Sequence, residues 1–148
     1  MQQAESSTER HAFTKEFACA GDAGSIAAAR DSIVQFLAHH GVSGEEEIDW
    51  MLALQEALAN AVFHGCRDDG SKTIRSTVEI TPEEIKIAIR DPGAGFNAES
   101  SADSTDSGAN LSEHGRGILL MRSLMDEISY HHGGAELWMR KRRMSRAD

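Results

Sequence analysis

The chain has 148 residues, the size of a single domain with one hydrophobic core. Its formal net charge of −9 argues against DNA or RNA as the main partner, because nucleic-acid binding rests on a cationic surface. The apolar runs are too short for a membrane-spanning helix, and segment 1–10 lacks the apolar region of a signal peptide. We therefore expect a cytoplasmic protein with no direct nucleic-acid or membrane partner, and we expect 1–10 to be a disordered leader.

The cysteines and histidines do not predict a metal site. Cys19 and Cys66 are too few for a disulfide framework and lack metal-ligand spacing. The pairs His39–His40 and His131–His132 are adjacent in sequence, so their side chains point apart on a helix or strand. We expect two reduced, partly buried thiols and no zinc.

The first half of the chain predicts one strand and two helices. The strand is expected at 11–18, and helical spacing of apolar residues begins at Asp22 and continues to about residue 39. Ser43 and Glu46 have the spacing of a capping box that opens the second helix, which Gly65 closes. The apolar stripes expected to face the core are Ile26, Ala29, Ile33, Val34 and Leu37 in the first helix, and Ile48, Met51, Leu52, Leu58, Ala59 and Val62 in the second.

The second half predicts two hairpins separated by a long loop and a helix. Alternating apolar residues predict strands at 74–80 and 85–89, and a second hairpin is expected over 128–139. Segment 97–114 has no periodicity and is rich in Ser, Asp and Gly, which is typical of a lid or binding loop. A short helix is expected at 115–125.

This order of elements predicts an α+β fold. Consecutive hairpins favour a mixed, mostly antiparallel sheet, with the helices packed on one face as a two-layer sandwich. The folded domain is expected over 11–142, followed by a basic tail at 143–148. The basic run Arg140–Arg143 is interpreted as a solvated strand end rather than a nucleic-acid patch, with contact to an acidic protein as a further alternative.

Two polar residues on the second helix have the chemistry of a nucleotide site. Glu56 and Asn60 are four residues apart, so both side chains project from one helix face. An Asn oxygen is a suitable Mg²⁺ ligand, and a carboxylate one turn away can act as a general base. Taken alone, the spacing is more typical of an ordinary polar surface pair.

A second candidate segment follows the strand at 85–89. Asp91 is followed by Gly93 and Gly95, which let the backbone turn tightly and approach a ligand. An Asp at this place can accept a hydrogen bond from an exocyclic amine such as that of adenine. An Asx turn without a ligand is the alternative.

A third candidate segment, Gly115–Arg116–Gly117, opens the last predicted helix. Exposed N–H groups at a helix start form a phosphate site, and glycines allow close approach. Such dipoles, together with Mg²⁺, would let a protein of charge −9 bind a polyanion. A flexible hinge is the alternative for a lone Gly-x-Gly.

The three segments, in this order, resemble the ATP-binding boxes of the GHKL family, which includes gyrase, histidine-kinase and mismatch-repair ATPase domains. The matching runs are Glu56–Gly65, Asp91–Phe96 and Gly115–Asp126. Within the family, the likeness is greatest to the stand-alone anti-sigma-factor serine/threonine kinases of bacterial partner-switching systems. The resemblance covers 11–142 and implies a sheet backed by helices on one face.

The resemblance also implies roles for individual residues. Glu56 would activate the attacking hydroxyl, Asn60 would bind Mg²⁺, and Asp91 would recognise the adenine amine of ATP. Segment 97–114 would be the ATP lid. The protein would phosphorylate an anti-sigma-factor antagonist, would alternatively sequester a sigma factor, and would form a homodimer. The remaining residues expected to line the nucleotide site are His64, Gly93, Gly95, Gly115, Arg116 and Gly117.

Two features depart from the family pattern. Ala135 stands where the family often has a Thr after the Gly-Gly turn, and the segment 97–114 is acidic. Both favour an alternative function, in which the domain switches protein partners with or without ATP and transfers no phosphate.

Overall fold

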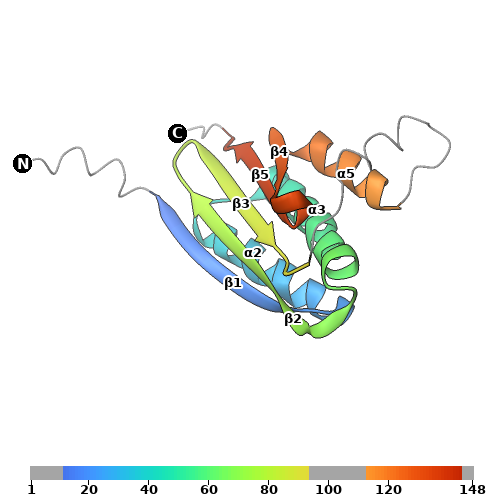
Figure 1. Ribbon diagram of the computed structural model, residues 1–148. Helices are drawn as coiled ribbons and strands as arrows, with labels where there is room; N and C mark the ends of the chain where they lie inside the picture. Colours follow the sequence, from blue (N-terminus) through green and yellow to red (C-terminus); the bar gives the residue numbers. More distant parts are fainter. Residues whose placement is uncertain (1–11, 94–112, 145–148) are drawn as a thin grey trace, which may run out of the picture.

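Five strands form one sheet, and the helices cover one of its faces (Figure 1). The computed structural model describes residues 12–93 and 113–144 of the chain. The strand order is β1-β2-β3-β5-β4, and each neighbouring pair is antiparallel. The predicted α+β fold is confirmed, with antiparallel rather than mixed pairing in the described sheet.

The elements follow one another in the predicted order. They are β1 (Phe13–Gly21), the 3₁₀ turn η1 (Ala23–Ser25), α2 (Ile26–His39), α3 (Gly44–Asn60), the π-helical turn η2 (Ala61–Gly65), β2 (Asp69–Ile80), β3 (Glu84–Arg90), α5 (Glu113–Leu124), β4 (Glu127–His131), the 3₁₀ turn η3 (His132–Gly134) and β5 (Glu136–Arg142). Among the described residues, no helix is long and apolar enough to cross a membrane.

The sheet buries one face because its strands alternate apolar and polar residues. On β2, the side chains of Ile74, Val78 and Ile80 are at most 1% exposed and pack under the helices. Thr81 closes the β2–β3 hairpin, because its hydroxyl accepts the backbone N–H of Glu84 at 3.1 Å. The tight turn fixes the register, so alternate residues of both strands face the open side of the sheet.

The buried face of α3 differs from the predicted one. Ile48 and Leu52 were expected in the core, but they are 53% and 44% exposed. Leu58 and Val62 are buried as predicted, but the rest of the buried stripe was not predicted, and its members are Trp50, Ala53, Leu54 and Ala57. Because α3 carries apolar residues on two faces, spacing alone does not choose between them, and burial of the large Trp50 decides the orientation.

The starts of two helices also differ from the prediction. The first helix begins at Ile26 after a 3₁₀ turn, not at Asp22. The predicted capping box is wrong: Ser43 is the N-cap of α3, but its side chain makes no capping hydrogen bond. Glu46, the expected partner, is 5% exposed, so its side chain turns toward the protein interior rather than toward the N-cap.

Two further boundaries shift by a few residues. β1 runs to Gly21 rather than to residue 18, because it pairs with nearly the whole length of β2. Helix α5 begins at Glu113, two residues before the predicted start, so Gly115 and Gly117 lie inside its first turns rather than at its very beginning. The predicted leader at 1–10 and most of the predicted lid at 97–114 lie outside the described residues.

Most of the basic run near the C-terminus belongs to β5, and two of its side chains are ion-paired. Arg140 donates to Glu127 at 3.0 Å and to Glu84 at 3.1 Å. The Lys141 ammonium lies 3.4 Å from the Asp49 carboxylate of α3. The run ends a strand, as predicted, and Arg142 is exposed, but Arg140 and Lys141 are also ion-paired and tie β5 to β3, β4 and α3.

The orientation of α3 gives the first testable prediction. Leu54→Ala should lower the free energy of unfolding by about 2–5 kcal/mol, because Leu54 is fully buried and its truncation leaves a cavity. Leu52→Ala is the same change on the exposed face of α3, and it should alter the free energy of unfolding by less than about 0.5 kcal/mol. Urea denaturation of both variants measures the difference; equal losses would contradict the orientation described.

Candidate functional site

Helix α3 changes geometry where the candidate site begins. After Asn60 the helix widens into the π turn Ala61–Gly65, and the N–H of Cys66 donates to the carbonyl of Ala61 at 2.8 Å. π turns inside helices occur frequently at functional sites. The turn brings Gly65 beside the end of β3 while Asn60 stays on the last turn of α3.

Asp91 is the most constrained acidic group of this region. It is 8% exposed, its own N–H donates to the carbonyl of Ala135 at 3.0 Å, and its Oδ1 accepts the N–H of Gly93 at 2.8 Å. A side chain at Gly65 would overlap the Asp91 carboxylate, and one at Gly93 would overlap Gly65. Two glycines are therefore needed for the backbone to close around this carboxylate.

Burial changes the chemistry of Asp91. Loss of hydration raises the pKa of its carboxyl above the ordinary value, an effect that the Gly93 N–H and the positive charge of Arg90 partly offset. Raised pKa values of buried carboxyls occur often at functional sites, although structural groups also show them.

A small cavity lies next to Asp91, between α3 and the sheet. Its volume is about 20 Å³, room for one water molecule but not for a purine ring. The side-chain nitrogen Nδ2 of Asn60 is buried and has no hydrogen-bond partner among the described residues. The cavity is lined by Ala57, Asn60, Ala61, Ile89, Asp91, Tyr130, Gly134, Ala135 and Leu137.

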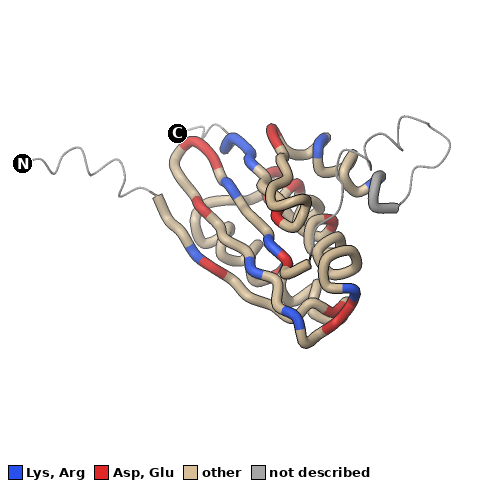
Figure 2. The backbone as a smooth tube through the Cα atoms, in the orientation of Figure 1, with Lys and Arg blue, Asp and Glu red and all other residues tan. Residues whose placement is uncertain are grey.

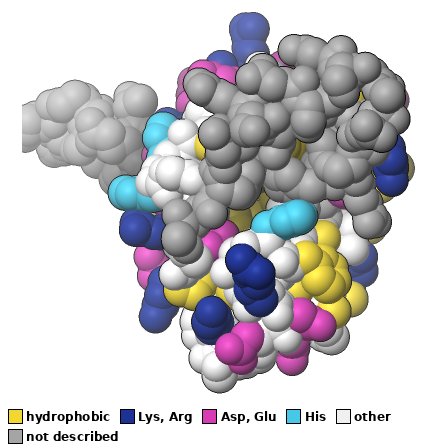
Figure 3. Space-filling view, turned by 45° about the vertical axis from the view of Figure 1, so that its right-hand side comes forward, with side chains coloured by type: hydrophobic (Ala, Val, Ile, Leu, Met, Phe, Trp, Pro, Cys, Tyr) yellow, Lys and Arg dark blue, Asp and Glu magenta, His cyan; other side chains and the backbone are white. Residues whose placement is uncertain are grey.

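Glu56 lies one turn before Asn60 and reaches the start of α5. A Cβ atom placed on Gly117 would come within 2.5 Å of Oε1 of Glu56, so the carboxylate rests directly on this glycine. Figure 3 looks onto the side of the molecule that carries α3 and α5. Histidine, basic and hydrophobic side chains lie next to one another on it. The segments containing Glu56, Asp91 and Gly117 thus meet at one end of the fold.

Comparison with known proteins agrees with this arrangement. A family model described as a histidine kinase-like ATPase domain matches residues 19–141. The chain belongs to this family. It is also 31% identical over 119 residues to the "Anti-sigma F factor" of Clostridium perfringens strain SM101, an alignment that covers 77% of this chain and 85% of that protein.

A second relative has a name that specifies an activity. The chain is 32% identical over 109 residues to the "Serine-protein kinase RsbW" of Staphylococcus aureus strain MSSA476, with 68% of this chain and 69% of that protein covered. The resemblance to the anti-sigma-factor kinases within the kinase-like ATPase family is thereby confirmed.

The structure of this kinase-like ATPase domain brings some of the predicted site residues together. Asn60 and Asp91 line the same cavity, Gly93 holds Asp91, and Glu56 contacts Gly117. The other predicted residues are placed less centrally. His64 is exposed on the π turn, Arg116 is exposed on α5, Gly115 lies in the first turn of α5, and Gly95 lies outside the described residues.

Several neighbours of the site were not predicted from the sequence, among them Gly65, Tyr130 and Leu137. Gly65 was interpreted as a helix end, yet it packs against the Asp91 carboxylate. Tyr130 and Leu137 come from the last hairpin and line the cavity, where burial raises the pKa of Tyr130 to about 12. Tyr130 is the chain's only tyrosine, but its place in a strand pattern gives no signal for a pocket.

The raised pKa of Asp91 predicts a pH-dependent effect of Asp91→Asn. A folded-state pKa above the unfolded value means that the parent protein loses stability as the pH rises from about 3.8 through the raised pKa. The Asn variant carries no such charge, so its stability relative to the parent should increase over this interval. Urea titrations from about pH 3 to about pH 7 measure the difference.

Asp69→Asn is the matched control, because its carboxyl has the opposite shift. Hydrogen bonds from the Ser71 hydroxyl and backbone N–H lower the pKa of Asp69 below its ordinary value. The parent protein therefore gains stability from Asp69 at neutral pH and loses it as the pH falls through the lowered pKa. If the stability of both variants relative to the parent changed with pH in the same direction, burial would not be what governs the pKa of Asp91.

Proposed function

We propose that this protein is an ATP-dependent serine/threonine protein kinase that phosphorylates an anti-sigma-factor antagonist and alternatively binds a sigma factor. The observation that carries the proposal is the meeting of the three candidate segments at one end of the fold. Glu56 rests on Gly117, and Asn60 shares a cavity with Asp91. The names of the relatives, an anti-sigma factor and a serine-protein kinase, support this combination of sigma-factor binding and kinase activity.

Asp91 would recognise the base of ATP. Its Oδ1 is already engaged by Gly93, so Oδ2 is the oxygen that would accept the exocyclic amine of adenine. The apolar lining from α3 and β5 would pack on the purine, after the present cavity widens to admit the ring. The glycines at 65 and 93 let the backbone approach this close.

Asn60 fits the role of Mg²⁺ ligand. Its amide is buried at the cavity, and Nδ2 makes no hydrogen bond among the described residues. The amide can therefore turn its oxygen toward a cation without breaking an existing contact. When bound, Mg²⁺ would neutralise charge on the phosphates of ATP.

Glu56 would accept the proton of the attacking serine or threonine hydroxyl. It is half-buried and lies one helical turn from Asn60. Contact with Gly117 would hold it beside the first turns of α5, whose N–H groups would face the phosphates. Phosphoryl transfer depends mainly on such positioning and on charge neutralisation, so few protein groups are required.

We infer a cytoplasmic homodimer by analogy with the kinases that the chain resembles. A second candidate function is a partner-binding switch that transfers no phosphate. Ala135 favours it, because its methyl group lines the cavity where the family pattern often supplies a hydroxyl. A missing hydroxyl would weaken the hold on the nucleotide.

Asp91→Asn should weaken Mg²⁺-ATP binding. The Asp91 carboxylate would accept a hydrogen bond from the adenine amine, whereas an Asn amide has no charge and can present a donor there instead. One hydrogen bond to a charged group is therefore lost, and the dissociation constant for ATP should rise about tenfold or more. Isothermal calorimetry measures this change, and Asp69→Asn serves as the control with an equal charge change. Absence of ATP binding by the folded parent protein would overturn the proposed nucleotide site.

Glu56→Gln should separate catalysis from binding. Loss of the general base should slow phosphate transfer to the antagonist by about 100-fold or more while leaving ATP affinity close to that of the parent. Transfer of labelled phosphate from ATP measures the rate, and Glu45→Gln at the far end of α3 is the control. An unchanged rate in Glu56→Gln would exclude the assigned role; no transfer by the parent would favour the partner switch.

A further inference from the structure

The face of the sheet opposite the helices carries an arginine pair. Arg75 of β2 and Arg90 of β3 are direct cross-strand partners, and both side chains are exposed on this open face. Figure 2 shows the corresponding basic segments side by side on the two strands. Like charges placed directly opposite each other in a sheet are destabilising, so this pair opposes folding.

Carboxylates of the described residues balance the pair only weakly: the charge of Arg90 acts on the adjacent Asp91, whose pKa it lowers, but not at ion-pair distance. Arg75 lies between Ala18 of β1 and Arg90, and neither arginine makes an ion pair with a described carboxylate. Glu136 is the cross-strand partner of Arg90, but its Oε1 lies 3.1 Å from Nε2 of His132 instead.

The other cations of this open face behave differently. Lys86 lies within 4 Å of Glu79 and Glu84, at 3.9 and 3.8 Å, and Arg140 is paired with Glu84 and Glu127. The row of charges that runs through Lys86 and Arg140 is therefore balanced by its own carboxylates. Arg75 and Arg90, in contrast, have no carboxylate within 4 Å among the described residues.

An exposed tryptophan lies between the arginine pair and a hollow. Trp138 of β5 is 38% exposed and is the cross-strand partner of Ala88, one row from Arg90. Beside it is a hollow of about 430 Å³, whose lining includes Ser129, His131 and Arg140. Tryptophan and arginine are among the residues enriched at the positions that dominate protein–protein binding energy.

We propose that Arg75, Arg90 and Trp138 form a docking site for an acidic segment of a protein partner. Each guanidinium would take a carboxylate in a two-pronged pair, and an apolar side chain of the segment would enter the hollow beside Trp138. An isolated arginine pair matches a few carboxylates. It does not match a nucleic-acid backbone, which needs a longer cationic track free of the glutamates found here.

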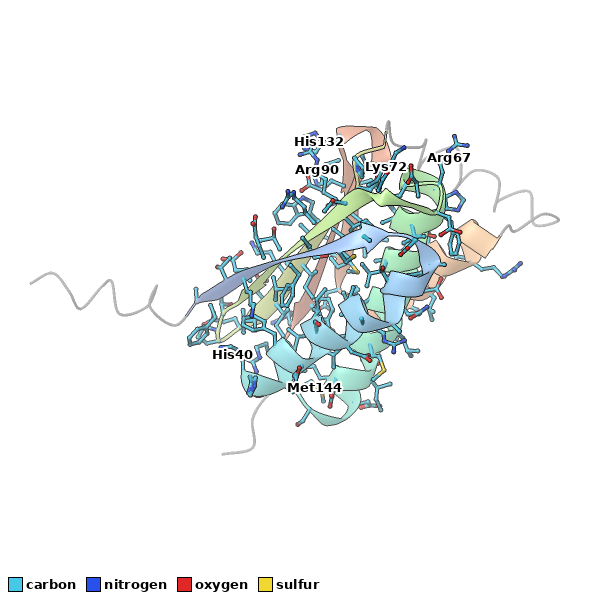
Figure 4. All side chains as sticks on the ribbon, turned by 90° about the horizontal axis from the view of Figure 1, so that it is seen from below. His40, Arg67, Lys72, Arg90, His132 and Met144 are labelled. Carbon is cyan, nitrogen blue, oxygen red and sulfur yellow. The ribbon has the colours of Figure 1, made fainter. Side chains whose placement is uncertain are left out.

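The docking site adjoins the candidate nucleotide pocket without sharing its residues. Arg90 directly precedes Asp91, and Arg90 contacts His132 at 3.4 Å in the turn that leads to the pocket residues Gly134 and Ala135. Figure 4 shows Arg90 and His132 together at the end of the sheet, on the side away from α2. A partner held there would touch both chain segments that position Asp91.

Charge reversal at Arg75 tests the proposal. The probe is a labelled peptide of about 12 residues that alternates Asp or Glu with Leu or Phe, and fluorescence anisotropy without nucleotide measures its affinity. Arg75→Glu should weaken binding about tenfold or more, because it removes one pair and adds repulsion. Arg122→Glu on the helix side changes the net charge equally and should leave the affinity unchanged.

Stability measurements separate docking from folding. Arg75→Glu places opposite charges across β2 and β3, so its unfolding midpoint should equal or exceed that of the parent. Trp138→Ala should also weaken binding of the peptide. The amide NMR shift changes that the peptide causes should centre on β2, β3 and β5. Four results would overturn the proposal: no peptide binding, equal loss in Arg122→Glu, NMR shifts centred elsewhere, or tighter binding of single-stranded DNA. None of these measurements requires ATP, so failure of the nucleotide site would leave them interpretable.

Discussion

The candidate site depends on one buried carboxylate enclosed by backbone. Asp91 directly follows β3, is tied through the carbonyl of Ala135 to the residue before β5, and is closed off by Gly65 of the π turn after α3. Three parts of the chain that are distant in sequence therefore converge on one side chain. Because burial disfavours its charge, this acid is retained at some cost in folding free energy.

Sequence patterns predicted the fold because apolar and polar residues alternate along the strands, and this two-residue period leaves little doubt about which face of the sheet is buried. Strand β2 alternates buried isoleucine and valine with polar residues, so its face and hairpin partner follow directly. The buried face of helix α3 could not be predicted in this way, because the apolar residues Ile48 and Leu52 lie on a different face from Trp50 and Leu54. Only the tertiary packing of Trp50 against the sheet distinguishes the two stripes, and spacing contains no information about it.

The candidate site was predicted by type of residue more than by contact. Glu56, Asn60 and Asp91 have chemistry that is visible in sequence, and the structure places them at one end of the fold. The role of Gly65 was not predictable in the same way. A glycine after a helix usually marks only its end, and its contact with a carboxylate on another strand depends on the path of the chain through the intervening π turn.

The π turn makes the length of α3 a fixed quantity. Its wide hydrogen-bonded loop accommodates one more residue than a regular helical turn would. Deleting that residue would rotate the following residues about the helix axis but leave Asn60, which precedes it, in place. Gly65 would then no longer face Asp91. Insertions and deletions in this part of the family should therefore accumulate beyond Cys66, in the connection that leads to β2, and should spare the five residues before it.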